Sequence, residues 1–272
     1  MMTEDTFAAF KEFIEGNVGI RLPPAKKVML EARLAKRVRA LGFSTHEEYR
    51  EYVFSPEGFD REVQQLIDAV TTNETSFFRE APHFDILTES VLPEFIRSGA
   101  LEVNMWSVAA STGQEAFTLA MVAEEFARAR GLAARYRVLA TDISDKVLSI
   151  AKTAIYTESQ AEKIPPALKR AYCLRSRDHR SRTIRMKPEL RARVSFRKLN
   201  LMDSSYPVGK KYGVVFCRNV FIYFDRPTQR KILERLYACM ESGGFLFMGH
   251  SENITQANVP FKAIASAVYR RE

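Results

Sequence analysis

The chain has 272 residues, 46% of them hydrophobic and 27% charged, and a formal net charge of +8. This length and composition are ordinary for a globular protein with two domains. They exclude a membrane-spanning protein, since no run approaches the roughly 20 apolar residues that cross a bilayer, and the start lacks a signal-peptide pattern, so we expect a cytoplasmic location. The three cysteines and four histidines are scattered, and we therefore predict neither a disulfide framework nor a metal site.

The positive charge is concentrated in two stretches. Residues 160–200 contain 13 basic and 3 acidic residues, and residues 21–42 contain seven basic residues and one acidic residue. Two basic patches on an otherwise acidic chain favour acidic partners that bind at particular places, and solvated charged faces are the alternative. We expect no nucleic acid partner, because these stretches lack interleaved aromatic residues for base stacking.

Residues 1–72 are predicted to form a helical N-terminal domain. The spacing of Phe7, Phe10 and Ile14 gives a first amphipathic helix, and Pro23-Pro24 opens a second. A third helix is predicted after residues 44–47 and a fourth from Pro56. The apolar stripe of the second helix is predicted to be Leu30, Leu34, Val38 and Leu41. Beside that stripe lie three cations, Lys26, Arg33 and Arg37.

Residues 73–100 are predicted to be a linker followed by the first helix of the catalytic domain. The segment TTNETSFFRE, residues 71–80, places two adjacent phenylalanines among polar residues, which indicates a packed segment. An ordinary interdomain loop, with Asn73 and Thr75 as turn or cap residues, is the alternative. Pro82 marks the start of the next helix.

From residue 101 to 272 strands and helices alternate, which predicts a largely parallel sheet. A buried strand over 103–108 runs into the small-residue turn AASTG and then a helix that carries Glu115 in its first turn. Such a turn binds a ligand at the strand's carboxyl end, and the acid favours a cation over a phosphate, unless it simply stabilises its own helix. The second strand ends at Asp142, where α/β cofactor folds hold ribose hydroxyls; a helix-capping aspartate is a compatible interpretation.

A basic insertion over residues 156–193 interrupts this alternation of strands and helices. Short strand-like runs at 171–174 and 183–186 predict a small antiparallel unit. Strands are then predicted over 194–199, 212–217 and 245–248, with a helix over 227–240 stopped at Gly243-Gly244 and one last strand over 261–269. The strand ends at Ala109, Asp142, Asn200 and Arg218 are expected to meet at the carboxyl edge of one sheet.

Six motifs together resemble the CheR-type chemotaxis receptor methyltransferases: WSVAASTGQEAF, ATDIS, FRKLNL, FCRNVFIYFD, ESGGFLFMGHSE and TTNETSFFRE. The resemblance covers nearly the whole chain. It implies an α/β, Rossmann-like class I fold that binds S-adenosylmethionine (SAM), with a seven-stranded sheet whose last strand is antiparallel, after an all-α N-terminal domain. It also implies a protein-glutamate O-methyltransferase that needs no metal. The enzyme would methylate glutamate side chains on the cytoplasmic helices of chemoreceptors, the methyl-accepting chemotaxis proteins, and release S-adenosylhomocysteine (SAH).

The resemblance also implies a set of site residues. Arg79 and Tyr223 are predicted to be catalytic. A glutamate with a pKa of about 4.3 is already ionised near neutral pH, so the acceptor needs aiming rather than a general base. Arg79 can hold a carboxylate in a fork and Tyr223 can donate one hydrogen bond, unless its hydroxyl is satisfied locally. The predicted cofactor-binding residues are Asn73, Thr75, Arg79, Glu115, Asp142, Asn200, Leu201, Arg218 and Asn219.

Two surfaces are expected to bind the receptor. Lys26, Arg33 and Arg37 would face glutamate-rich receptor helices and steer association. The insertion differs from that of family members that bind a pentapeptide at the receptor's C-terminus, because its loop RSRDHRSRT has no glycine, so this partner stays open. The alternative functions are an RNA or small-molecule methyltransferase and a non-catalytic receptor-binding regulator with the same fold.

Overall fold

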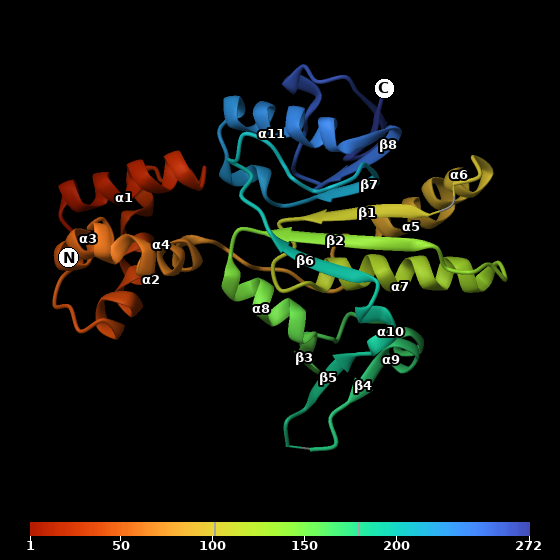
Figure 1. Cartoon of the computed structure of the whole chain (residues 1–272), viewed down its shortest axis with the longest axis horizontal. Helices are drawn as coiled ribbons and strands as arrows, with labels where there is room; N and C mark the ends of the chain where they lie inside the picture. Colours follow the sequence, from red (N-terminus) through yellow and green to blue (C-terminus); the bar gives the residue numbers. More distant parts are fainter. Residues whose placement is uncertain (101, 179) are drawn as a thin grey trace.

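The computed structural model describes residues 1–100, 102–178 and 180–272. A helical N-terminal domain lies at one end of an α/β domain, whose seven-stranded sheet is accompanied by a separate three-stranded sheet (Figure 1). The predicted fold class is therefore confirmed. Within the described ranges, no helix is long and apolar enough to cross a membrane.

The N-terminal domain is a bundle of four helices around one apolar core. Thr3, Thr45 and Ser55 begin three of its helices, because their side-chain oxygens accept hydrogen bonds from free backbone N–H groups of the first turn. Leu41 was expected in the core stripe but is 36% exposed, because its helix ends one residue earlier. The elements are α1 (Glu4–Asn17), the turn η1 (Pro24–Lys26), α2 (Lys27–Ala40), α3 (His46–Val53) and α4 (Pro56–Val70).

The central sheet has the strand order β6-β2-β1-β7-β8-β10-β9. Successive strand residues enter different cores, as the alternation of strand side chains requires: Met105 and Val214 pack in one cluster, and Trp106 and Val215 in another. The parallel strands are β1 (Val103–Val108), β2 (Tyr136–Asp142), β6 (Val194–Lys198), β7 (Tyr212–Cys217) and β8 (Met240–Met248).

Helices cover both faces of this sheet. The first core cluster joins the sheet to α5 (Pro82–Ile86), the π-helical turn η2 (Leu87–Val91), α6 (Leu92–Arg97) and α7 (Gln114–Ala129). The second joins it to α11 (Arg226–Cys239), which Figure 1 shows on the side of the sheet away from α7. Four further helical elements are α8 (Asp145–Thr153), α10 (Pro188–Arg191), η3 (Phe221–Tyr223) and η4 (Thr255–Ala257).

The insertion has three strands rather than the two expected. β5 (Thr183–Met186) pairs antiparallel with both β3 (Ile155–Thr157) and β4 (Cys173–Arg175), and α9 (Pro166–Tyr172) precedes β4. The short segment of β3 follows α8 directly and carries too little alternation to be recognised in the sequence. Figure 1 shows the insertion projecting from the sheet on the side of α8.

Two predicted elements at the C-terminal end were wrong. The last strand is a hairpin, β9 (Phe261–Ala265) and β10 (Val268–Arg271), because Ala267 adopts a left-handed φ of 55° and turns the chain. Gly243 and Gly244 lie inside β8 and do not stop a helix. Gly244 is needed there since a Cβ would lie 3.1 Å from the carbonyl oxygen of Gly213, at the point where the pairing with β7 shifts register.

The N-terminal domain contacts the carboxyl edge of the sheet through its polar groups. The side-chain amide of Asn200 donates to the carbonyl oxygen of Asn17 at 2.7 Å, and the N–H of Arg21 donates to the carbonyl oxygen of Tyr223 at 2.9 Å. These bonds join the end of α1 and the following segment to the loops after β6 and β7. The helical domain therefore forms one wall of any binding site at this edge of the sheet.

Candidate active site

One cavity lies where the carboxyl ends of the parallel strands face the N-terminal domain. Every residue that the sequence predicted to bind the cofactor or to be catalytic lines it. These residues come from the linker, from the ends of β2, β6 and β7, from the start of α7 and from η3. The structure thus brings the predicted set together; the role of each residue stays a prediction.

The turn after β1 brings its backbone close to the cavity. Ala109 and Ser111 adopt left-handed φ values of 53° and 50°, and Gly113 has a φ of 92°. A Cβ on Gly113 would lie 3.0 Å from the Cβ of Ala151, so glycine also permits the close packing of α8. The Ser111 hydroxyl donates to the carbonyl oxygen of Asn73 at 2.8 Å, which ties the linker to this turn.

Asp142 is a buried carboxylate at the end of β2. Its Oδ2 accepts from the N–H of Ser111 at 2.8 Å, and its Oδ1 accepts from the N–H of Ser144 at 3.0 Å. Burial raises the pKa of Asp142, and these two N–H donors oppose the rise. Helix α8 is capped by the Ser144 hydroxyl, so Asp142 is not its N-cap residue and its remaining lone pairs suit hydroxyl groups of a ligand.

Glu115 has a charged partner inside the protein. Its Oε2 accepts from the Nε of Arg218 at 2.7 Å, and its Oε1 accepts from the hydroxyl of Ser107 at 2.6 Å. The sequence had assigned the cofactor as the partner of this carboxylate, whereas the structure gives it a buried arginine. Glu80 lies 3.4 Å from the other side of the same guanidinium, so two carboxylates surround one cation. The group retains a net negative charge, which favours a cationic ligand.

Arg79 and Tyr223 approach the cavity from different elements. Arg79, at the end of the linker, donates from Nη1 to the carbonyl oxygen of Glu74 at 3.0 Å, which leaves its other N–H groups for a ligand. Tyr223 is the last residue of η3 and is partly exposed. Both side chains line the same cavity. A cation and a hydroxyl at one site fit an anionic acceptor.

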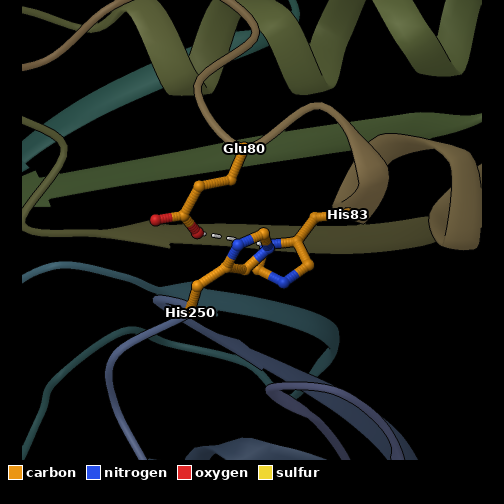
Figure 2. A group of neighbouring side chains, drawn as sticks. All are labelled: Glu80, His83 and His250. Atoms are coloured by element: carbon orange, nitrogen blue, oxygen red, sulfur yellow. Dashed lines mark ion pairs between the residues drawn. The ribbon is translucent and has the colours of Figure 1, made fainter.

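Glu80, His83 and His250 form a cluster next to this site, and Figure 2 shows their side chains pointing toward one another. Their potential ligand atoms lie within 4.8 Å of one another, which resembles a metal site. Arg218 argues against that interpretation, because its Nη1 lies 3.0 Å from the Nδ1 of His83 and supplies the positive charge itself. Burial, followed by the Arg218 charge, lowers the pKa of His83 to about 4, so its ring is neutral and accepts from the arginine.

The cations predicted to face the receptor are only partly free. Arg37 forms a bidentate pair with the buried Glu62, at 2.7 and 2.8 Å, and Arg33 donates to the carbonyl oxygen of Val70 and to the Thr72 hydroxyl. Both arginines therefore hold α2 against α4 and the linker, and their contact with a receptor stays a prediction. Lys26 donates to the carbonyl oxygen of Arg21 at 3.3 Å.

Several cavity residues were missed in the sequence. Val18 and Ile20 reach the cavity from the end of α1, and Phe224 follows η3. Their apolar character gave no signal beyond that of core residues. Glu80 closes the motif TTNETSFFRE, but its ion pair with Arg218 depends on a contact between segments 138 residues apart.

The sheet order and the cavity at the carboxyl edge of the sheet fit the fold of a SAM-dependent methyltransferase. Residues 73–270 match the model of the CheR methyltransferase SAM binding domain, and residues 5–71 match that of the CheR methyltransferase all-alpha domain. The chain belongs to the CheR methyltransferase family. It is a SAM-dependent methyltransferase.

Relatives of similar length support this membership. The chemotaxis protein methyltransferase of Borreliella burgdorferi is 34% identical over 99% of this chain and 95% of its own. That of Escherichia coli is 35% identical over 98% and 91%. Among solved structures, the glycopeptide N-methyltransferase MtfA complexed with SAM is 15% identical, with a TM-score of 0.36 over 71% of this chain and 59% of that chain.

Proposed function

We propose that this enzyme methylates glutamate side chains of chemoreceptors, giving glutamate methyl esters and SAH. The observation that carries the proposal is the placement of Arg79 and Tyr223 in the same cavity as Glu115 and Asp142. The acids suit a cationic methyl donor and the arginine suits an anionic acceptor. SAM meets the first requirement, and a glutamate carboxylate meets the second.

The cavity fits SAM in its residue types. When bound, SAM supplies an electrophilic methyl group on a sulfonium, and its reaction with a carboxylate oxygen gives an ester and neutral SAH. Asp142 would hold the ribose hydroxyls, and Leu201, which is buried, would contact the adenine beside Asn200. The negative group around Arg218 would face the cationic part of the donor.

The protein's own residues orient the acceptor. Arg79 pairs with the carboxylate through two parallel N–H groups, and Tyr223 donates a single hydrogen bond. No residue has to remove a proton, because the acceptor is ionised near neutral pH. The N-terminal domain helps to exclude water, since Val18 and Ile20 cover the cavity with apolar surface. Positioning and desolvation therefore account for the catalysis that the protein supplies.

Lys26 and its neighbours on α2 support a receptor surface on the N-terminal domain. Lys36 and Arg39 are exposed on this helix, so they add free positive charge for a glutamate-rich helix bundle. A second contact is an acidic and aromatic peptide at the receptor's C-terminus. The observation that favours it is that β4 is an edge strand with Leu174 47% exposed, next to exposed Arg175.

Transfer of labelled methyl from SAM to receptor-containing membranes tests the function. We expect label that base treatment releases as methanol, which identifies a carboxyl ester. Label that resists base, or that enters RNA or a small molecule, would contradict the proposal. SAH binding without transfer would indicate a non-catalytic regulator. For the second contact, absence of detectable binding of the purified protein to receptor C-terminal peptides would exclude it.

A further inference from the structure

Glu252 is a buried carboxylate outside the residues that line the cavity. It contacts the loop of residues 219–223, several of which line the cavity. The residue follows β8 and is only 6% exposed. Burial raises the pKa of Glu252, and hydrogen bonds from backbone N–H groups oppose this rise. A buried carboxylate is costly unless its oxygens are fully bonded, so its partners indicate what it does.

In the part of the chain that the structure describes, three backbone N–H groups near the site donate to this carboxylate. Oε2 accepts from the N–H of Asn219 at 2.8 Å and from that of Gly249 at 2.7 Å. Oε1 accepts from the N–H of Phe221 at 2.8 Å. Asn219 has a left-handed φ of 58°, which a non-glycine residue keeps only when its surroundings hold it. The carboxylate thus fixes the backbone on both sides of Val220.

This contact sets the direction of η3. Phe221 is the first residue of that turn and Tyr223 the last, so the carboxylate satisfies a free N–H at its start as an N-cap residue would. At the other end, Gln229 donates from Nε2 to the carbonyl oxygens of Phe221 and Phe224, at 2.9 and 3.2 Å. Glu252 and Gln229 together hold both ends of the loop that carries the tyrosine.

Gly249 provides an independent sign that this approach is built into the fold. A Cβ at this position would lie 2.7 Å from the Oε2 of Glu252 and 3.0 Å from the backbone nitrogen of Asn219. Glycine is therefore required for the close approach of the β8 loop to the Asn219 loop.

We propose that Glu252 is a positioning residue for methyl transfer, which holds the loop of residues 219–223 so that Asn219 and Tyr223 face the cavity correctly. The inference rests on the proposed roles of these two residues. It predicts that the loop, not the global fold, loses its structure when the carboxylate is altered.

Glu252→Gln is the main test, because the amide keeps the size of the side chain but has a single acceptor oxygen. Its NH2 group therefore faces either the N–H donors of Asn219 and Gly249 or that of Phe221. Gly249→Ala pushes the two loops apart without changing the carboxylate. Glu124→Gln is the matched control: this half-buried carboxylate on α7 accepts from the Tyr136 hydroxyl at 3.0 Å, away from the cavity. Hydrogen exchange of the 219–221 amides, thermal unfolding, SAH affinity and steady-state kinetics are measured for each variant.

We expect Glu252→Gln and Gly249→Ala to increase exchange of these amides at least tenfold while β7 amides keep their protection. We also expect at least tenfold weaker SAH binding or lower kcat, with the KM for receptor within about twofold, a pattern absent from Glu124→Gln. Wild-type SAH affinity and kcat in a variant whose loop amides exchange rapidly would overturn the proposal. So would losses that follow only the change in unfolding temperature. If the wild-type enzyme transfers no methyl to receptor, the proposed function fails, and SAH binding and exchange still test Glu252.

Discussion

The Nε of Arg218 lies 2.7 Å from the Oε2 of Glu115, and the arginine side chain is only 1% exposed. The pair joins the strand β7 to the first turn of α7 inside the cofactor cavity. Removal of the Glu115 carboxylate would leave the buried Arg218 without one of its two carboxylate partners. We therefore expect stability and cofactor binding to depend on the same contact.

Glu115→Gln should weaken both stability and cofactor binding. Loss of one partner of a buried ion pair costs about 3 kcal/mol or more, and Glu80 beside Arg218 offsets part of this loss. We expect a lower unfolding temperature and at least tenfold weaker SAH binding by calorimetry. Ser107→Ala is the matched control, since it keeps the charge and removes only the hydroxyl bond to Glu115, worth about 1.5 to 3 kcal/mol. Equal effects of the two variants would contradict the role of the charge.

Tyr223→Phe should lower kcat and leave SAH affinity unchanged. One hydrogen bond to a charged acceptor contributes about 1.5 to 3 kcal/mol, which corresponds to roughly a tenfold to 150-fold loss of rate. Steady-state kinetics with receptor-containing membranes and a parallel SAH titration separate the two effects. A phenylalanine variant with full activity would show that the hydroxyl does not aim the acceptor.

Charge reversal in the N-terminal domain should separate receptor binding from folding. Lys26→Glu is expected to raise the apparent KM for receptor several-fold at low salt, with wild-type unfolding temperature and SAH affinity. Arg37→Glu should instead destabilise the helical domain, because it faces the buried Glu62 with a like charge. If Lys26→Glu leaves the KM unchanged at every salt concentration, this face does not bind the receptor.

His83 should make stability depend on pH. Its pKa is lowered from 6.5 to about 4 in the folded state, first by burial and then by the charge of Arg218. Between these values the unfolded state binds more protons, so the free energy of unfolding falls as pH decreases from 6.5 toward 4. At 1.36 kcal/mol per pKa unit, the total loss is about 3 kcal/mol.

Urea unfolding of the wild type and of His83→Gln at several pH values checks this dependence. The glutamine keeps an oxygen that can accept from Arg218 but does not titrate, so the slope in this window should flatten. His250→Gln is the control, because His250 is exposed beside the same cluster and should leave most of the slope in place. A wild-type slope in His83→Gln would contradict the assignment.

Ala109 should tolerate glycine and reject valine. Its φ of 53° is left-handed, where a β-branched side chain is strongly disfavoured and glycine is not. We expect Ala109→Val to cost about 1 to 2 kcal/mol and to weaken SAH binding, because the turn lines the cavity. Ala109→Gly should keep the affinity. Thermal unfolding and SAH titration measure both effects, and equal affinities in the two variants would show that the turn does not contact the cofactor.

The sequence predicted the fold class and which residues would lie together at one sheet edge, because both depend on local patterns. Strands that end at Asp142, Asn200 and Arg218 must meet at one edge of a parallel sheet, and the structure places them around one cavity. Helix caps such as Thr3 and Ser55 are equally local, because each side-chain oxygen accepts from a backbone N–H three residues further on.

The predictions failed where backbone geometry or distant contacts decide. The left-handed φ of Ala267 turned one expected strand into a hairpin, and the register shift beside Gly244 placed a supposed helix stop inside β8. Neither residue type predicts these conformations. Alanine rarely adopts a left-handed φ, and a pair of glycines occurs in turns, at helix ends and in strands.

The sequence by itself determined which chemical groups the enzyme has: the acids that we propose for a cationic donor, and the arginine and tyrosine that we propose for an anionic acceptor. The tertiary structure alone decided which of them are free to act. Arg37 pairs with Glu62, Glu115 pairs with Arg218, and Glu252 bonds to the loop of Tyr223. A pairing between residues 25 or 103 positions apart depends on how the whole chain packs, and no local pattern encodes it.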